Sequence, residues 1–354
     1  MVQITKSSPS SSPLSSSVYQ QESVDATILV DELLQYTRSL MNGAQHHMIA
    51  YSGGIDSSLV AALVHKSAST SSSNSGSEET VQAVLGLSPA VPSEQVVLAE
   101  QVASFIGISL EQIPTTEGTD AIYIENSGQA CLACKTHLYT CLNAIMEHHE
   151  GDTTKGAITG LTRRLYNGTN ADDLNDPTRL GLIAADRFDV RSPLERTPKA
   201  LVRIAGRHLG LPNWNHAASP CLRSRLALGV EAIPQHLQRI ERAERFVRQR
   251  LDLDATHNLR VRLLSQNRAM VEVDELVLDS AKASLKDDNE SLWQTYFEDK
   301  LGFASVDVRC FKSGSVAPTI ASSSNTENRE RISPTANDSN NERRKSRAET
   351  SILG

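Results

Sequence analysis

The chain has 354 residues, which at about 150 residues per domain is long enough for two domains. Its 42 acidic residues outnumber 35 lysines and arginines, for a formal net charge of −7, and aromatic residues make up only 4%. This composition argues against a protein that coats duplex nucleic acid, which needs a basic face, and against a stacking platform for single strands. Five cysteines are too few for a disulfide scaffold, and no apolar run approaches the roughly 20 residues that span a bilayer. The composition therefore predicts a cytoplasmic protein with no membrane partner and no stable nucleic-acid partner.

Three polar stretches contain few residues that a core could bury. Residues 7–17 and 67–77 are mostly serine, and the chain from Ser315 onward is rich in Ser, Asn, Glu and Arg. Such segments cannot offset the entropy of ordering, so we expect a disordered N-terminus over 1–25, a loop insertion at 67–77 and a disordered tail over 315–354. The first stretch is poor in acidic residues, as an organelle transit peptide is, but it has no arginine before Arg38. Cytoplasmic localisation is therefore preferred to organelle targeting.

Short apolar strands alternate with amphipathic helices over the first two thirds of the chain. Strands are expected at 47–51, 81–87, 108–113 and 157–160, with helices at 56–65, 94–106, 134–146 and 199–209. This order predicts an α/β fold of the Rossmann type, with a parallel sheet covered by helices on both faces. Residues 211–220 are punctuated by proline and predict a boundary. Beyond it, a long helix over 237–251 and strands at 259–264, 269–273 and 304–308 predict a smaller α/β domain.

A glycine-rich turn follows the first predicted strand. Two adjacent glycines let the backbone approach a ligand, and the helix that follows offers free N–H groups and a positive dipole end. A parallel sheet binds ligands where a strand ends and enters a helix, so this turn is typical of a phosphate loop. Its candidate ligand-binding residues are Ser52, Gly53, Gly54, Asp56, Ser57 and Ser58.

The composition of this loop limits what it binds. It lacks the lysine of a Walker loop, so it is not suited to a transferring γ-phosphoryl group. Asp56 is unfavourable beside phosphates unless a cation such as Mg²⁺ lies between them. Taken alone, the pattern also fits a structural glycine turn with an aspartate near a helix start. The loop resembles that of the PP-loop ATPases, which cleave ATP between the α and β phosphates, adenylate an oxygen and let a nucleophile displace AMP.

A series of short motifs downstream narrows this resemblance. In order and spacing they closely resemble the LarE family of PP-loop sulfur transferases, over about residues 26 to 315. The motifs are Asn-Gly-Thr-Asn-Ala-Asp-Asp at 167–173, Arg179 with Gly181, Val-Arg-Ser-Pro-Leu at 190–194, Leu-Gly-Leu-Pro at 209–212, Ser-Pro-Cys-Leu-Arg-Ser-Arg at 219–225, Arg-Val-Arg at 260–262 and the segment from Gly302 to Ser315.

LarE enzymes act in the synthesis of the nickel-pincer nucleotide cofactor. They adenylate a carboxylate of pyridinium-3,5-biscarboxylic acid mononucleotide and convert it to a thiocarboxylate. The resemblance therefore implies ATP, Mg²⁺, a small pyridinium mononucleotide substrate and a homo-oligomer. It also implies a PP-loop ATP-binding domain over 26–215 and a C-terminal domain for sulfur transfer and substrate over 216–314.

The resemblance assigns roles to particular residues. Cys221 is the sulfur-bearing nucleophile, because a thiolate readily attacks a mixed anhydride with AMP, and the arginines beside it favour the thiolate. Asp56 and Asp173 are the carboxylates expected on Mg²⁺. Arg260 and Arg262 alternate along a strand, so both point to one face, either as a phosphate clamp or as surface arginines. The candidate catalytic residues are Cys221, Asp56, Ser224 and Arg225, and the further nucleotide-binding candidates are Gly168, Thr169, Asn170, Arg191, Arg260 and Arg262.

The source of the transferred sulfur has two interpretations. In one form of the family the active-site cysteine gives up its own sulfur and becomes dehydroalanine. Here Cys131 and Cys134 add a CxxC pair, so the chain is also similar to members in which three cysteines hold a four-iron cluster, with Cys221 as the third ligand. Zinc, a redox pair or two small residues at a helix start are the remaining interpretations of the pair.

The sequence departs from the family pattern in two places. Residues 175–179 replace a tyrosine-containing segment, and Arg223 stands where a small residue is common. Because of these departures, the resemblance supports the ATP chemistry more strongly than it supports the identity of the substrate that accepts the sulfur. The alternatives are another adenylating PP-loop enzyme, such as a tRNA thiolase or an amidotransferase-type synthetase, or a nucleotide-binding regulator without turnover. A thiolase would carry a basic RNA-binding domain, and an amidotransferase would need a source of ammonia.

Overall fold

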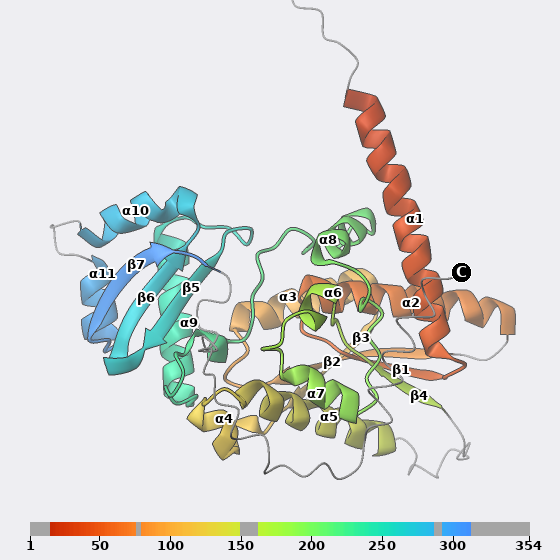
Figure 1. Ribbon diagram of the computed structural model, residues 1–354, viewed down its shortest axis with the longest axis horizontal. Coiled ribbons are helices and arrows are strands. Elements are labelled where there is room, and N and C mark those ends of the chain that lie inside the picture. Colours follow the sequence, from red (N-terminus) through yellow and green to blue (C-terminus); the bar gives the residue numbers. More distant parts are fainter. Residues whose placement is uncertain (1–14, 76–78, 149–161, 287–291, 313–354) are drawn as a thin grey trace, which may run out of the picture. The chain divides into compact units, whose positions relative to one another are not determined.

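The computed structural model describes residues 15–75, 79–148, 162–286 and 292–312 (Figure 1). All of them belong to one compact unit, Met1–Ala317, and the second unit, from Pro318 onward, lies outside the described residues. The expected disordered tail lies there as well. Within the part of the chain that the structure describes, no helix is both long and apolar enough to cross a membrane.

The first sheet is fully parallel, as the alternation of strands and helices predicts. Its strands are β1 (His46–Ala50), β2 (Thr80–Leu87), β3 (Ser109–Pro114) and β4 (Arg163–Tyr166), in the order β3-β2-β1-β4. His46 aligns with Thr80 on one side and with Arg163 on the other. Three expected strands are confirmed to within one residue, whereas the one expected at 157–160 lies outside the described residues and β4 was not predicted. The fold is an α/β fold with a Rossmann-like parallel sheet.

The two faces of this sheet bury alternate residues, as the period of two requires. Ile49 of β1 packs into one core with α1 (Ser15–Met41), α2 (Ile55–Ser75), α3 (Ser93–Ile106) and α8 (Lys199–His208). Its neighbours Met48 and Ala50 pack into a separate core with α5 (Ala130–His148) and α7 (Gly181–Arg187). Helices therefore cover both faces, and the carboxyl ends of the strands are left for loops.

Two of the serine-rich predictions are wrong over part of their length. Helix α1 begins at Ser15, so the disordered N-terminus does not extend to residue 25. Helix α2 continues to Ser75, so most of the expected loop at 67–77 is helical. In this part of α2, Ser69 Oγ donates to the carbonyl of His65 (2.9 Å) and Thr70 Oγ1 to that of Lys66 (3.0 Å), so the helix itself accommodates these hydroxyls.

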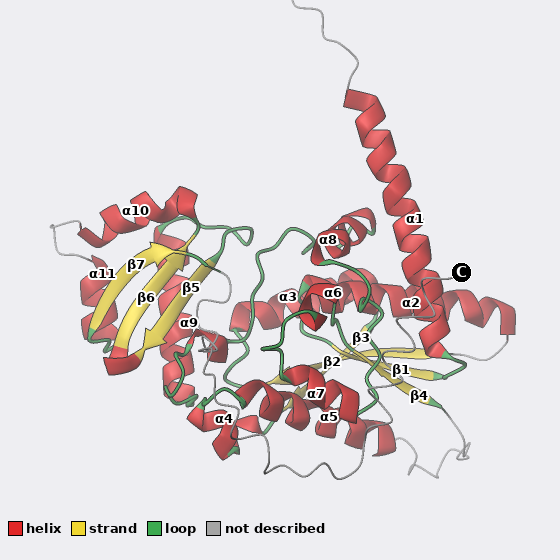
Figure 2. Ribbon diagram, in the orientation of Figure 1, coloured by secondary structure: helices red, strands yellow, loops and turns green. Residues whose placement is uncertain are grey.

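A second, three-stranded sheet lies in the C-terminal part (Figure 2). Its strands are β5 (Leu259–Leu264), β6 (Arg268–Val273) and β7 (Ser305–Cys310), with β5 antiparallel and β7 parallel to β6. The helices of this part are α9 (Pro234–Arg250), α10 (Glu275–Lys286) and α11 (Leu292–Gln294). Its core contains Trp293 and Phe297 and also Ala90 and Tyr123 of the first part. The proposed domain boundary at 216 stays a prediction.

A buried carboxylate crosslinks the second sheet. Glu272 on β6 is fully buried, and its two oxygens accept from Arg262 Nε on β5 (2.7 Å) and from Arg309 Nη2 on β7 (2.5 Å). One carboxylate therefore ties both neighbouring strands to the central one. Arg262 is itself only 6% exposed, so it depends on this carboxylate for charge compensation.

We expect Glu272→Gln to lower the free energy of unfolding by about 3–5 kcal/mol, because it leaves the buried Arg262 uncompensated. Chemical denaturation followed by circular dichroism measures this change. Asp307→Asn, on an exposed position of β7, is the matched control and should be nearly neutral. Equal stabilities of the two variants would contradict this role for Glu272.

Candidate functional site

The glycine turn between β1 and α2 is closely packed. Gly53 has φ +70°, and a Cβ atom at this position would lie 2.7 Å from the Cα of Ala99 on α3. Tyr51 Oη also donates to the carbonyl of Ala99 (3.2 Å). Only glycine fits this conformation and this contact without displacing α3, so the turn needs Gly53 for its shape.

Buried amide side chains hold the carbonyls of this turn. Asn213 Nδ2 donates to the carbonyl of Gly53 (2.7 Å) and to Ser58 Oγ (3.1 Å), and Gln95 Nε2 donates to the carbonyl of Ser52 (2.7 Å). Ser57 Oγ donates to the carbonyl of Gly54 (3.0 Å) and accepts from the amide of Ser52 (3.2 Å). The turn is therefore fixed before any ligand arrives. Neither Asn213 nor Gln95 was predicted from the sequence.

A second loop, after β4, packs directly on the start of α2. A Cβ atom on Gly168 would lie 2.7 Å from the amide nitrogen of Ser57, so glycine permits this approach. The buried Asn167 braces the loop: its Oδ1 accepts from Ser192 Oγ (2.7 Å) and from the Thr169 amide (3.1 Å). The structure thus brings together two of the predicted ligand-binding segments.

Asp56 lies where these two loops meet. Asn170 Nδ2 donates to Asp56 Oδ1 (3.1 Å), and Lys199, the first residue of α8, forms an ion pair with Asp56 Oδ2. Asn170 also caps the short helix α6 (Ala171–Leu174) in a capping box with Asp173. The loop itself has no lysine, but the fold supplies one from α8. Lys199 was not predicted as a site residue. In the sequence it is only a lysine after a proline at a predicted helix start, and it is far along the chain from Asp56.

Asp173 is the second acidic group of this site. Burial raises the pKa of its carboxyl, Arg179 opposes this shift and the charge of Asp56 adds to it. Arg179 Nη2 forms an ion pair with Asp173 Oδ1 at 2.7 Å. Asp56 and Asp173 are thus close enough to affect one another, and each has a cationic partner. This pair of carboxylates suits a divalent cation that arrives with phosphate oxygens as its other ligands.

Two of the three predicted sulfur ligands, Cys131 and Cys221, lie near the guanidinium of Arg223. Cys131 and Cys134 are in the first turns of α5, and Cys221 directly precedes the 3₁₀ helix Leu222–Arg225. Arg223 Nη2 donates to Cys131 Sγ (2.6 Å), and the charges of Cys221 and Cys131 both raise the pKa of Arg223. Burial raises the pKa of the Cys131 thiol, and that of the Cys134 thiol to about 12. Among the described residues, no three His, Cys, Asp or Glu side chains are placed to hold a metal ion.

Cys221 is fixed through its backbone. Its carbonyl accepts from Ser224 Oγ (2.7 Å) and from Arg225 Nη1 (3.0 Å). Arg225 is 1% exposed and forms a two-pronged ion pair with Glu244 of α9, with Nε–Oε1 at 2.9 Å and Nη2–Oε2 at 3.2 Å. Ser224 and Arg225 therefore position the cysteine rather than contact its sulfur.

The segment after β2 contacts both the glycine turn and the residue that follows Cys221. The carbonyl of Ala90 accepts from the amide of Leu222 (2.7 Å), and a few residues later Gln95 holds Ser52. On the other side of the site, Arg179 pairs with Asp173. The phosphate loop and the segment that contains Cys221 are thus linked by one short series of hydrogen bonds, through Gln95 and Ala90.

The predicted arginines differ in their partners. Arg260 and Arg262 of β5 are each 6% exposed, whereas Val261 between them packs in the core. Arg262 is paired with Glu272. Arg260 donates to the carbonyls of Leu259 (2.6 Å) and Ala218, and burial lowers the pKa of its guanidinium to about 10. Arg191 pairs with Asp189 (2.8 Å), beside the second loop.

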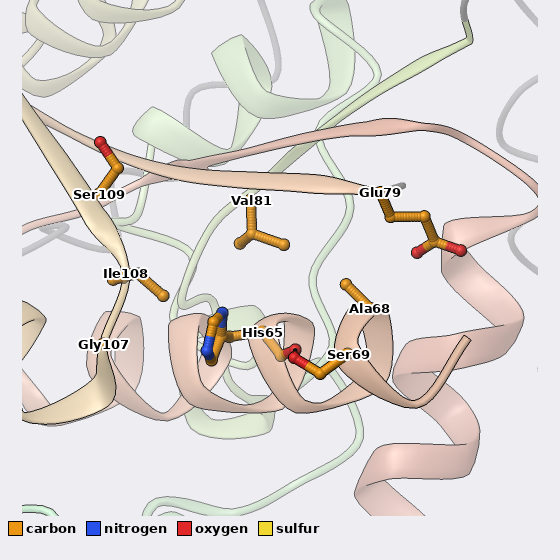
Figure 3. A pocket seen from close by; sticks show the side chains of 8 residues that line it. All are labelled: His65, Ala68, Ser69, Glu79, Val81, Gly107, Ile108 and Ser109. Carbon is orange, nitrogen blue, oxygen red and sulfur yellow. Dashed lines mark hydrogen bonds between the residues drawn. The ribbon is translucent and has the colours of Figure 1, made fainter. Parts of the chain in front are cut away.

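A cavity of about 500 Å³ lies elsewhere, at the amino ends of the strands (Figure 3). It is lined by His65 of α2, Glu79 before β2 and Ser109 at the start of β3, among others. Ligands of parallel sheets bind at the carboxyl ends, where the glycine turn lies. The cavity contains none of the predicted site residues.

No protein-family model matches the chain. It is 32% identical over 222 residues to the uncharacterized protein slr1717 of Synechocystis, covering 62% of this chain and 75% of that protein. It is 26% identical over 206 residues to the pyridinium-3,5-bisthiocarboxylic acid mononucleotide synthase of Lactiplantibacillus plantarum, covering 58% of this chain and 67% of that protein.

Among solved structures, NMN synthetase from Francisella tularensis is similar, with a TM-score of 0.40 and 20% identity over 55% of this chain and 75% of that one. A similarity this distant supports no conclusion about the site. The sequence relatives and the parallel sheet agree with the motifs along the chain. So does the glycine turn, beside which Asn170 and Lys199 lie. The similarity to the synthase of Lactiplantibacillus plantarum agrees with the resemblance of the motifs to the LarE family of PP-loop ATPases.

Proposed function

We propose that this chain is an ATP-dependent sulfur transferase that adenylates a carboxylate of a pyridinium mononucleotide and converts it to a thiocarboxylate. The observation that carries this proposal is the linkage of the glycine turn, through the segment after β2, to the backbone of Leu222, the residue that follows Cys221. A similar protein is named as a synthase of a pyridinium bisthiocarboxylic acid mononucleotide, which supports the choice of substrate class.

The phosphates of ATP would bind at the glycine turn. Backbone amides at the start of α2 and the hydroxyl of Ser52 are donors there, and Lys199 adds a positive charge. The hydroxyl of Ser57 donates to the Gly54 carbonyl and Ser58 is buried, so these two serines shape the turn. Asp56 and Asp173 would hold Mg²⁺, which when bound neutralises the departing pyrophosphate. A carboxylate oxygen of the substrate attacks the α-phosphorus, and the bond between the α and β phosphates breaks.

The sulfur would come from Cys221. Its thiolate attacks the acyl carbon of the adenylate, AMP leaves, and a thioester joins the substrate to the protein. Loss of the α-proton of Cys221 to a base, with cleavage of the Cβ–Sγ bond, then releases the thiocarboxylate and leaves dehydroalanine. The hydrogen bonds from Ser224 and Arg225 to the Cys221 carbonyl hold the residue in place. A cluster held by Cys131, Cys134 and Cys221 stays the alternative sulfur source, and no step is routed through it.

The phosphate of the mononucleotide would bind near Arg260. Unlike Arg225 and Arg262, Arg260 forms no ion pair among the described residues, and its bonds are to carbonyl oxygens. A buried cation without a carboxylate partner favours an anion. The proposed phosphate clamp therefore reduces to Arg260, with Arg262 committed to Glu272. The homo-oligomer implied by the family resemblance stays a prediction.

We expect Asp56→Ala to abolish the release of AMP and pyrophosphate, because both the cation and Lys199 lose their carboxylate partner. Product formation with ATP, Mg²⁺ and the biscarboxylate mononucleotide is measured by chromatography. Asp31→Asn, at an exposed position of α1, is the control and should release AMP at the wild-type rate. AMP release by the alanine variant would contradict the role given to Asp56.

Cys221→Ala should leave adenylation largely intact while no thiocarboxylate forms, since the nucleophile acts after the first step. Mass spectrometry of the wild-type protein after turnover should show the loss of H₂S at Cys221. Thiocarboxylate from the alanine variant would refute Cys221 as the donor, even if AMP formation is normal.

Gly53→Ala should abolish ATP binding, because the new Cβ would overlap the backbone of Ala99 in a left-handed conformation. Calorimetric titration with ATP in the presence of Mg²⁺ tests this expectation. Gly43→Ala is the matched control: it also has φ +70°, but nothing lies within 4 Å of its Cβ position. Equal ATP affinities of both variants would argue against the turn as the nucleotide site.

A further inference from the structure

Both carboxylates that are proposed to hold Mg²⁺ already have a cationic partner. Lys199, the first residue of α8, forms an ion pair with Asp56 Oδ2, and Arg179 Nη2 pairs with Asp173 Oδ1 (2.7 Å). Asn170 joins the two acidic groups: its Nδ2 donates to Asp56 Oδ1 (3.1 Å), and its backbone amide donates to Asp173 Oδ2 (3.3 Å). The two carboxylates are therefore held beside one amide residue, and each contacts a cation of the chain.

The two cations differ in their surroundings. The side chain of Arg179 is 58% exposed and also pairs with Asp176 (3.6 Å), so it has a second carboxylate within reach. The side chain of Lys199 is 31% exposed, and Asp56 is the carboxylate with which it pairs. The neighbouring Asp172 accepts from the backbone amide of Lys199 (3.0 Å) and not from its ammonium group. The ion pair between Lys199 and Asp56 is therefore the contact that a metal ion has to displace.

A divalent cation that arrives alone competes with this ammonium group, because both need the oxygens of Asp56. The displaced ammonium group would then lie close to the metal ion, and like charges repel over such short distances. A nucleotide changes this balance, since its phosphate oxygens can bind the metal ion and accept hydrogen bonds from the ammonium group at the same time. Lys199 can therefore leave Asp56 without losing a charged partner only when the cation and the phosphates arrive together.

We propose that Lys199 occupies the Asp56 carboxylate in the nucleotide-free protein and moves to a phosphate oxygen when a nucleoside triphosphate brings the divalent cation. Lys199 is then a specificity-determining residue: it disfavours a free divalent cation and favours the complex of the cation with the nucleotide. The nucleotide half of this inference rests on the proposed function. The competition between Lys199 and a metal ion needs neither nucleotide nor the sulfur acceptor.

The first test is Mn²⁺ binding by the full chain without nucleotide, followed by electron paramagnetic resonance, since Mn²⁺ takes the same oxygen ligands as Mg²⁺. We expect Lys199→Met to bind Mn²⁺ about tenfold more tightly than the wild-type protein, because a charged hydrogen bond no longer competes for Asp56. Lys66→Met, at an exposed position of α2, is the matched control and should bind Mn²⁺ as the wild-type protein does. Asp56→Asn added to Lys199→Met should abolish the gain.

The second test is calorimetric titration with α,β-methylene ATP in the presence of Mn²⁺, because this analogue cannot be cleaved between its α and β phosphates. Lys199→Met should bind it about tenfold more weakly than the wild-type protein, since a phosphate loses its ammonium partner. The same substitution thus raises the affinity for the metal ion alone and lowers that for the nucleotide. A general loss of structure would lower both affinities.

Equal Mn²⁺ affinities of the wild-type protein and Lys199→Met would overturn the proposal. Absent binding of the analogue, or equal affinities of both proteins for it, would overturn the exchange of partners. If the methionine variant does not fold, Lys199→Gln replaces it with the same outcomes. Failure of the proposed function is seen separately, as wild-type protein that forms neither AMP nor thiocarboxylate, whereas the Mn²⁺ titrations contain no substrate.

Discussion

The site depends on the ion pair between Asp56 and Lys199. Asp56 is the second residue of α2, Lys199 begins α8, and Asn170 from the loop after β4 donates to the same carboxylate. Three segments that are far apart in the sequence therefore meet at one acidic group. A carboxylate at the positive end of a helix is favourable by itself, and here it also fixes the position of a lysine and an amide beside the phosphate loop.

Ion pairs and hydrogen bonds also fix the residues around Cys221. There, charged side chains hold the backbone and side chains in position. Arg225 is held by Glu244 and fixes the carbonyl of Cys221, while Arg223 is held by Asn126 and reaches Cys131. In the second sheet, Glu272 pairs with both Arg262 and Arg309. Each arginine is positioned by a partner on another element, which limits the freedom of the side chains around Cys221.

Much of this arrangement is predictable from the sequence, because the signals are local. The period of two and the helical spacing identify β1, β2, β3 and the helices between them, and the glycine turn identifies the carboxyl edge of the sheet. Lys199 and Asn213 were missed because their contacts join residues more than 140 positions apart. The serine-rich end of α2 was mispredicted because composition alone does not show that serine and threonine hydroxyls can donate to carbonyls of the same helix. The cysteine spacing suggested a cluster as one sulfur source, and this stays a prediction.

The central claim is that the sulfur of the product originates in Cys221. The most direct measurement uses protein labelled with a heavy sulfur isotope in cysteine and follows the label into the thiocarboxylate. The account predicts a labelled product, with one labelled thiocarboxylate formed per chain and none from an added sulfide source. An unlabelled thiocarboxylate, or repeated turnover with Cys221 intact, would contradict it.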